Sequence, residues 1–95
     1  MGTSVGYNFT NIATATTTVV KSGAGRLARI VVNTAVAGGV ITIYNNTAGS
    51  GTTIATITMP ATLLQNHFEI EYNCRFHTGL TIVTSAATNI TVVHD

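Results

Sequence analysis

The chain has 95 residues and a mass of 9.9 kDa, which is the size of a single domain. Only 7 % of its residues are charged, and its net charge is +1. These values exclude a disordered chain, which combines low hydrophobicity with high net charge, and a basic nucleic-acid-binding surface. Threonine occupies 19 positions and asparagine 8, and both residues disfavour long helices. The composition therefore predicts a small, nearly uncharged all-β protein.

The sequence lacks a membrane span, a signal peptide and a disulfide pair, and this narrows the class of protein further. The longest apolar run, residues 35–41, is far shorter than the roughly 20 residues that cross a bilayer, so no membrane partner is expected. The N-terminal residues lack the basic and apolar pattern of a signal peptide, and the single cysteine, Cys74, excludes an internal disulfide. We therefore expect synthesis in a reducing cytoplasm. Because the core of so short a chain is thin, we also expect self-association.

The first segment of the chain, residues 1–12, mixes Gly, Asn and aromatic residues without clean alternation. It is interpreted as an N-terminal arm or an edge strand, ahead of a β-sandwich domain over residues 13–95. The arm interpretation rests on Gly2 and Gly6 as flexible positions and on Tyr7 and Phe9 as contact residues. Such an arm could add a strand to the exposed sheet edge of a partner.

Segments rich in β-branched residues follow, separated by turn signals. They predict strands over residues 13–20, 26–34, 40–44, 52–59, 67–73, 80–84 and 89–94. In the second of these, Ala28, Ile30 and Val32 are expected to face the core and Leu27 the opposite side. Gly38-Gly39 is expected to join residues 26–34 and 40–44 in a hairpin.

From Pro60 onward the sequence shows a clear strand end and one segment of regular alternation. Pro60 ends the strand before it, and residues 61–66 are ambiguous, with one helical turn conceivable over 61–64. In residues 67–73 the alternation predicts that Phe68, Ile70 and Tyr72, and then Cys74, face inward, and a loop is expected to begin at Arg75. Seven or eight short strands with regular turns predict a two-sheet antiparallel β-sandwich of the jelly-roll kind, with a small barrel as the alternative.

The carboxylates and the possible metal ligands are the first candidates for a catalytic or metal-binding site. Glu69 and Glu71 share the outward face of one strand with His67. Paired carboxylates serve glycoside hydrolysis only within an aromatic-lined cleft, and the chain has no Trp, so a solvated or interface-facing strand is favoured. Cys74 and His77 form half of a structural zinc ligand set. We expect neither metal nor cofactor, and no enzyme, because nucleophile elbows and phosphate-binding loops are also absent from the sequence.

Two arginines are candidates for partner contact. Arg26 and Arg29 lie three positions apart on one predicted strand and so point to opposite faces. Arg29 stands between Leu27 and Val31, where it either reaches a partner carboxylate across an apolar surface or snorkels at an edge.

Several stretches resemble a known group of proteins. They are Gly-Arg-Leu-Ala-Arg-Ile-Val-Val-Asn-Thr-Ala (25–35), the run from Val40 through Ile57, Thr-Gly-Leu-Thr-Ile-Val-Thr (78–84) and Thr-Asn-Ile-Thr-Val-Val (88–93). Together they resemble small Thr- and Gly-rich β-sandwich structural proteins of tailed bacteriophages, including the capsid decoration (cement) proteins of cyanophages. The resemblance covers about residues 13–94 and rests on strand-and-turn patterns.

The resemblance implies a virion structural protein on the capsid surface. Its partners would be the major capsid protein and further copies of itself, with a trimer favoured because decoration proteins often occupy three-fold positions. The residues expected at such interfaces are Tyr7, Phe9, Arg26, Arg29, His67, Glu69 and Glu71. The alternative is a tail or fibre component, or a glycan-binding module, for which the aromatic candidates are Tyr7, Phe9, Tyr44 and Phe76.

Overall fold

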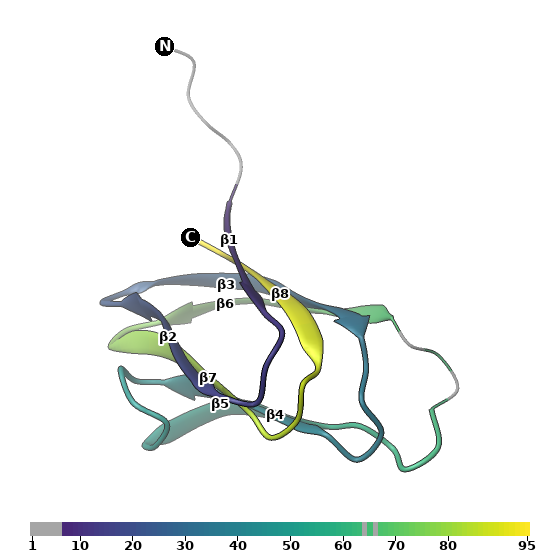
Figure 1. Ribbon diagram of the computed structural model, residues 1–95. Helices are drawn as coiled ribbons and strands as arrows, with labels where there is room; N and C mark the ends of the chain where they lie inside the picture. Colours follow the sequence, from purple (N-terminus) through teal and green to yellow (C-terminus); the bar gives the residue numbers. More distant parts are fainter. Residues whose placement is uncertain (1–6, 64, 66) are drawn as a thin grey trace.

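The computed structural model describes residues 7–63, 65 and 67–95 (Figure 1). Within those residues it contains eight β-strands and no helix, so it holds no helix that could span a membrane. The strands are β1 (Asn8–Ile12), β2 (Thr17–Ser22), β3 (Gly25–Thr34), β4 (Val40–Asn45), β5 (Thr52–Thr58), β6 (Phe68–Phe76), β7 (Gly79–Thr84) and β8 (Asn89–His94). The predicted all-β class is confirmed.

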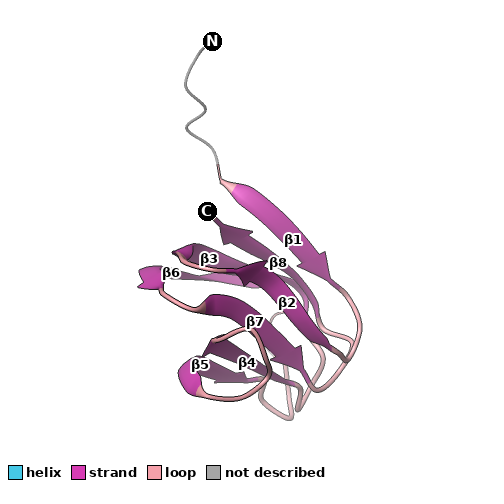
Figure 2. Ribbon diagram, turned by 90° about the vertical axis from the view of Figure 1, so that its left-hand side faces the viewer, coloured by secondary structure: helices cyan, strands magenta, loops and turns pink. Residues whose placement is uncertain are grey.

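The strands form two antiparallel four-stranded sheets that pack face to face (Figure 2). Sheet A has the order β1-β8-β3-β6, and sheet B has the order β2-β7-β4-β5. The pairing is nested, because β4 pairs with β5, β3 with β6, β2 with β7 and β1 with β8. This is the strand order of an eight-stranded jelly roll, which confirms the predicted sandwich.

The hairpin predicted at Gly38-Gly39 is wrong. β3 pairs with β6 and β8 in sheet A, whereas β4 pairs with β5 and β7 in sheet B, so the glycines carry the chain from one layer to the other. Gly38 adopts a φ of 74°, which favours glycine, and the Gly39 carbonyl accepts a 2.8 Å hydrogen bond from the amide of Met59. A glycine pair predicts a sharp turn, and the sheet in which the next strand pairs is decided by long-range contacts.

The strand predicted over residues 13–20 begins later, at Thr17. The preceding residues cross from sheet A to sheet B and are held by buried Thr84. Its hydroxyl donates to the carbonyl of Thr14 at 2.6 Å and accepts from the amide of Thr16 at 3.1 Å. The β-propensity of residues 13–16 is thus overridden by a side-chain tether.

A β-bulge changes the phase of β3. The register shifts between Leu27 and Arg29 in the pairing with both β6 and β8, so Leu27 and Ala28 are both buried. The prediction that Leu27 faces outward is therefore wrong, while Ile30 and Val32 are buried as predicted. On β6 the bulge is marked by Asn73, which has a φ of 47°.

The core lies between the two sheets and is built from aliphatic side chains. Sheet A contributes Ile30, Val32, Ile90 and Val92, and sheet B contributes Ile41, Ile43, Leu80 and Ile82, all with no exposed surface. Full burial of each such side chain stabilises the fold by about 1.5–3 kcal/mol. The sandwich therefore rests on a single apolar layer, as expected for a chain of this length.

The predicted alternation on β6 is confirmed, with outward positions exposed from Glu69 to Arg75 and inward positions shielded. The strand runs farther than predicted, through Phe76, which is fully buried. At the N-terminal side, β1 pairs with β8 from Asn8 opposite His94 to Ile12 opposite Ile90. Residues 2–6 of the candidate arm, and Leu64 of the candidate helical turn, lie outside the described residues.

Candidate functional site

The outer face of sheet A carries a row of side chains that crosses all four strands. Phe9 lies opposite Val93, Val93 opposite Arg29, and Arg29 opposite Glu71. Phe9 is 74 % exposed, the largest exposure of any bulky apolar residue described. The row therefore runs from an exposed aromatic ring through an aliphatic residue to an opposite-charge pair, and residues opposed in this way contact each other across strands.

A second row lies beside the first and is largely neutral. Asn11, Thr91, Val31 and Glu69 stand opposite one another in the same strand order. The amide of Asn11 donates to Oδ1 of Asn89 at 2.9 Å, and the amide of Asn33 donates to the same oxygen at 3.1 Å. These bonds tie β1, β8 and β3 together at their outer surface, so the face is held in a defined shape.

His67 stands at one end of this face. Together with Glu69, Val31 and Asn33 it lines an open hollow of about 430 Å³ over the β3–β6 pair. At the opposite end of β3, Nη1 of Arg26 donates to the hydroxyl of Tyr7 at 3.4 Å. That hydrogen bond, with a smaller contribution from the charge of Asp95, raises the pKa of Arg26 above its ordinary value.

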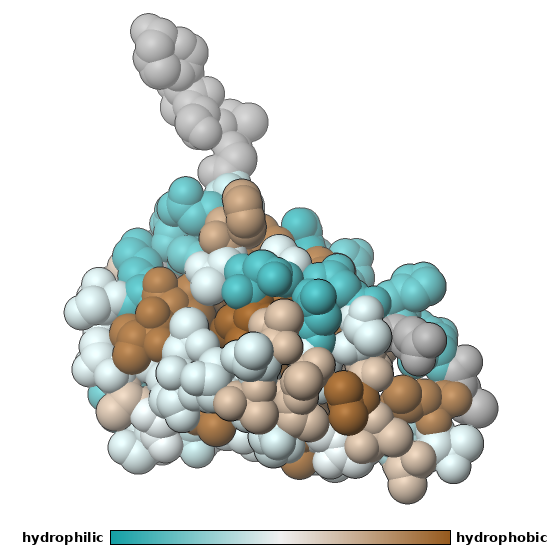
Figure 3. All heavy atoms as spheres, in the orientation of Figure 1, coloured by the Kyte–Doolittle hydropathy of each residue, from teal (hydrophilic) through white to brown (hydrophobic). Residues whose placement is uncertain are grey.

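The structure therefore places all seven predicted interface residues on the outer face of sheet A or at the ends of that sheet. Phe9, Arg29, Glu69 and Glu71 share the outer face of sheet A, whereas His67 and the Tyr7–Arg26 pair lie at its ends. In Figure 3 hydrophilic atoms gather over the upper part of the molecule, where sheet A lies in this view, and pale atoms of intermediate hydropathy cover much of the lower part.

The outer face of sheet B is partly covered by the chain itself. The loop over residues 46–51 lies on β7, because Oγ1 of Thr81 donates to the carbonyl of Asn46 at 2.7 Å and Thr81 has no exposed surface. A Cβ atom on Gly79 would lie 2.8 Å from Cγ2 of Thr47, so the glycine permits this close approach. Sheet B thus buries part of its outer face within the same chain.

The candidates for metal binding are not brought together. Cys74 is a half-buried free thiol on the inward side of β6, and His77 lies exposed in the turn that follows. Among the described residues, no group of three or more His, Cys, Asp or Glu side chains could hold a metal ion. Of the aromatic residues considered for sugar stacking, Phe76 is buried and Tyr44 is half-buried, which corrects the expectation that both are available.

No protein-family model matches the chain, and no curated protein sequence matches it.

Sequence reasoning missed the residues that complete the outer face of sheet A. Val93 becomes a neighbour of Arg29 only because β8 pairs with β3, and Asn11 joins the same face only because β1 pairs with β8. The alternation of apolar and polar residues gives each strand's outward side and contains no information about which strands pair. The predicted residues came from separate strands, and their common location follows from the jelly-roll order.

Proposed function

We propose that this protein is a structural component of a bacteriophage virion, specifically a capsid decoration protein that binds the outer capsid and stabilises capsomer junctions. The resemblance of residues 13–94 to such proteins supports the proposal. The fold adds support by analogy only, since double-sheet jelly rolls recur in viral capsid and lectin domains and one fold serves many functions.

One observation carries the proposal: the row Phe9–Val93–Arg29–Glu71 on the outer face of sheet A. An exposed aromatic residue beside aliphatic and arginine side chains is typical of the residues that dominate protein interfaces. The hydrogen bonds of Asn11 and Asn33 hold the underlying strands, so little ordering is required on binding.

The proposed partner is the major capsid protein, and the proposed assembly on it is a homotrimer. With four basic and three acidic residues in the whole chain, long-range electrostatic steering contributes little. Attachment would therefore rest on apolar contact and short-range hydrogen bonds, and it would persist at high salt.

Binding to capsids that lack the protein tests the proposal. We expect saturable binding at fixed stoichiometry, and we expect Phe9→Ser to weaken it by about tenfold or more, as for a central aromatic contact. Val19→Ser is the matched control, because Val19 is also an exposed apolar residue, 49 % accessible, but lies on β2 of sheet B. Light scattering during size exclusion reports whether the 9.9 kDa chain forms a trimer before binding.

The outcomes separate the alternatives. Absence of capsid binding, or equal losses in the Phe9 and Val19 variants, contradicts the proposal. Binding to a host glycan that is lost with Phe9→Ser would instead favour the glycan-binding module, since Phe9 and Tyr7 are the exposed aromatic candidates that the structure describes.

A further inference from the structure

Basic side chains gather at the end of the sandwich where β3 begins and β6 ends. Arg26 lies directly opposite Arg75 in the β3–β6 register. Nζ of Lys21 donates to the backbone oxygen of Asp95 at 3.0 Å, which brings a third cation to this end. Three of the chain's four Lys and Arg residues therefore meet at one place, and Asp95 is the acidic side chain among them.

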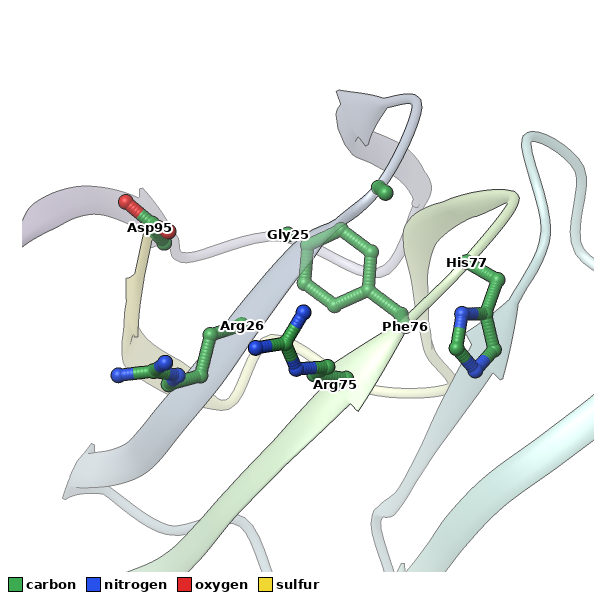
Figure 4. Close-up of a pocket in the computed structure, with 7 residues that line it drawn as sticks. Gly25, Arg26, Arg75, Phe76, His77 and Asp95 are labelled. Atoms are coloured by element: carbon green, nitrogen blue, oxygen red, sulfur yellow. The ribbon is translucent and has the colours of Figure 1, made fainter.

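These residues surround a pocket of about 240 Å³, shown in Figure 4. It is lined by Ala24, Gly25, Arg26, Arg75, Phe76, His77 and Asp95. The ring of Phe76 forms a buried wall against Gly25, where a Cβ atom would lie 2.6 Å from Cζ of the ring. The guanidinium of Arg75 lies beside that ring, and the guanidinium of Arg26 points away from it (Figure 4).

Hydrogen bonds fix the backbone on every side of this basic pocket. Oδ1 of Asn45 accepts from the amides of His77 and Thr78, both at 3.0 Å. The amide of Gly23 donates to the carbonyl of Thr78 at 2.9 Å, and the amide of Asp95 donates to the carbonyl of Arg26 at 2.8 Å. The pocket is thus preorganised by its own backbone and does not depend on the arginine side chains for its shape.

The basic pocket brings like charges close together. Like charges directly opposite each other on paired strands destabilise a sheet, and Arg26 and Arg75 occupy such positions. The guanidinium of Arg26 is directed to Tyr7, whereas that of Arg75 lies beside the Phe76 ring, so an oxyanion in the pocket would bind at Arg75 and reduce the repulsion between the two charges. A guanidinium presents a planar fork of donors that matches carboxylate and phosphate oxygens. We propose that the basic pocket binds a small oxyanion, either a phosphate or a carboxylate.

This proposal is independent of the virion function, because the pocket lies at the end of the sandwich and the proposed capsid-binding row lies on the outer face of sheet A. The ligand is defined by its chemistry: a compact group with two or more negatively charged oxygens that fits beside Phe76. Asp95 competes with it for the arginines, since its carboxylate lines the same pocket.

Titration with inorganic phosphate at constant ionic strength, followed by amide NMR shifts, tests the proposal. We expect saturable shifts centred on Gly25, Phe76 and His77. Arg75→Gln should raise the dissociation constant about tenfold, the size of one charge-assisted hydrogen bond. Arg29→Gln is the matched control, because it removes the same charge from the outer face of sheet A, opposite Glu71.

Asp95→Asn sharpens the test, because it removes the competing side-chain carboxylate and should tighten phosphate binding. A parallel titration with acetate identifies the source of the oxyanion. Preference for phosphate assigns a phosphate ligand, and equal or stronger acetate binding assigns a carboxylate. The proposal is overturned if neither anion gives saturable shifts at the pocket, or if Arg29→Gln weakens binding as much as Arg75→Gln. Retained amide dispersion in each variant shows that it is folded.

Discussion

The outer faces of the two sheets differ, although both inner faces contribute aliphatic side chains to the core. β3 and β6 of sheet A carry Arg26, Arg29, Glu69, Glu71 and Arg75, whereas the strands of sheet B carry a single charge, at Lys21. Sheet B covers β7 with its own loop over residues 46–51, and sheet A displays Phe9 at its surface. A face that the chain partly covers by itself leaves less surface for a partner, and a charged face bearing an exposed aromatic residue is suited to contact one.

Threonine has a different role in sheet A and in sheet B. Thr81 and Thr84 in sheet B are buried, and their hydroxyls hold a loop and a crossover segment. Thr91 of sheet A lies in the outer face and accepts a 3.0 Å hydrogen bond from the amide of Asn33. The abundance of threonine in this chain therefore supports both β-structure and the attachment of irregular segments to it.

The largest expected effect tests whether the two inner faces are equivalent. Ile30→Ala in sheet A and Ile43→Ala in sheet B each remove a fully buried side chain, so each should lower the free energy of unfolding by about 2–5 kcal/mol. Urea denaturation measures both. Phe9→Ala is the exposed control and should change stability by no more than about 0.5 kcal/mol. A cost near zero for either isoleucine would show that its sheet adds little to the common core.

A smaller effect tests whether the loop over residues 46–51 covers β7 on the outer face of sheet B. Thr81→Val keeps the side-chain shape but leaves the carbonyl of Asn46 without its 2.7 Å donor, and we expect a loss of about 1–3 kcal/mol. Thr56→Val, at an exposed position on β5, should stay within about 0.5 kcal/mol. Equal melting temperatures for the two variants would contradict the covering of β7 by this loop.

The smallest effect concerns the open β6 edge of sheet A. Burial raises the pKa of Tyr72 above its ordinary value, with a lesser contribution from Cys74. The neutral phenol is therefore favoured in the folded state, and its stabilising contribution is present below the unfolded pKa of about 10 and is lost as the pH rises through the folded value. Tyr72→Phe should weaken the decline in stability above about pH 10, as measured by urea midpoints against pH. Coincident pH profiles for the two proteins would contradict the shift.

The fold class and the strong local patterns could be predicted from sequence. β8 occupies the predicted residues 89–94, and the outward positions of β6 are the predicted ones, because strict alternation reports a half-buried strand directly. The phase of β3 could not be predicted, since the bulge at Ala28 depends on pairing with two neighbouring strands. The hairpin prediction failed for the same reason.

The candidate sites also combine residues that the sequence identifies with an arrangement that only strand pairing determines. Phe9, Arg29 and Glu71 could be singled out as individual residues, and their alignment in one row depends on the pairing of β1, β8, β3 and β6. The basic pocket could not be predicted at all, because Lys21, Arg75 and Asp95 lie far apart in sequence and come together only in the folded chain. A spacing motif predicts a site only when its residues lie in one segment of the sequence. The row on sheet A and the basic pocket each combine residues from several strands.

The nested strand pairing also orders the assembly of the fold in time. β4 and β5 are separated only by residues 46–51, so their pairing closes a short loop. Every further pair encloses the one before it, and the pairing of β1 with β8 encloses almost the whole chain. Because the entropic cost of closing a loop falls when its interior is already joined, folding is expected to proceed from the centre of the sequence outward. The strand that carries Phe9 is then the last to be added, and the outer face of sheet A is completed only once the rest of the sandwich is in place.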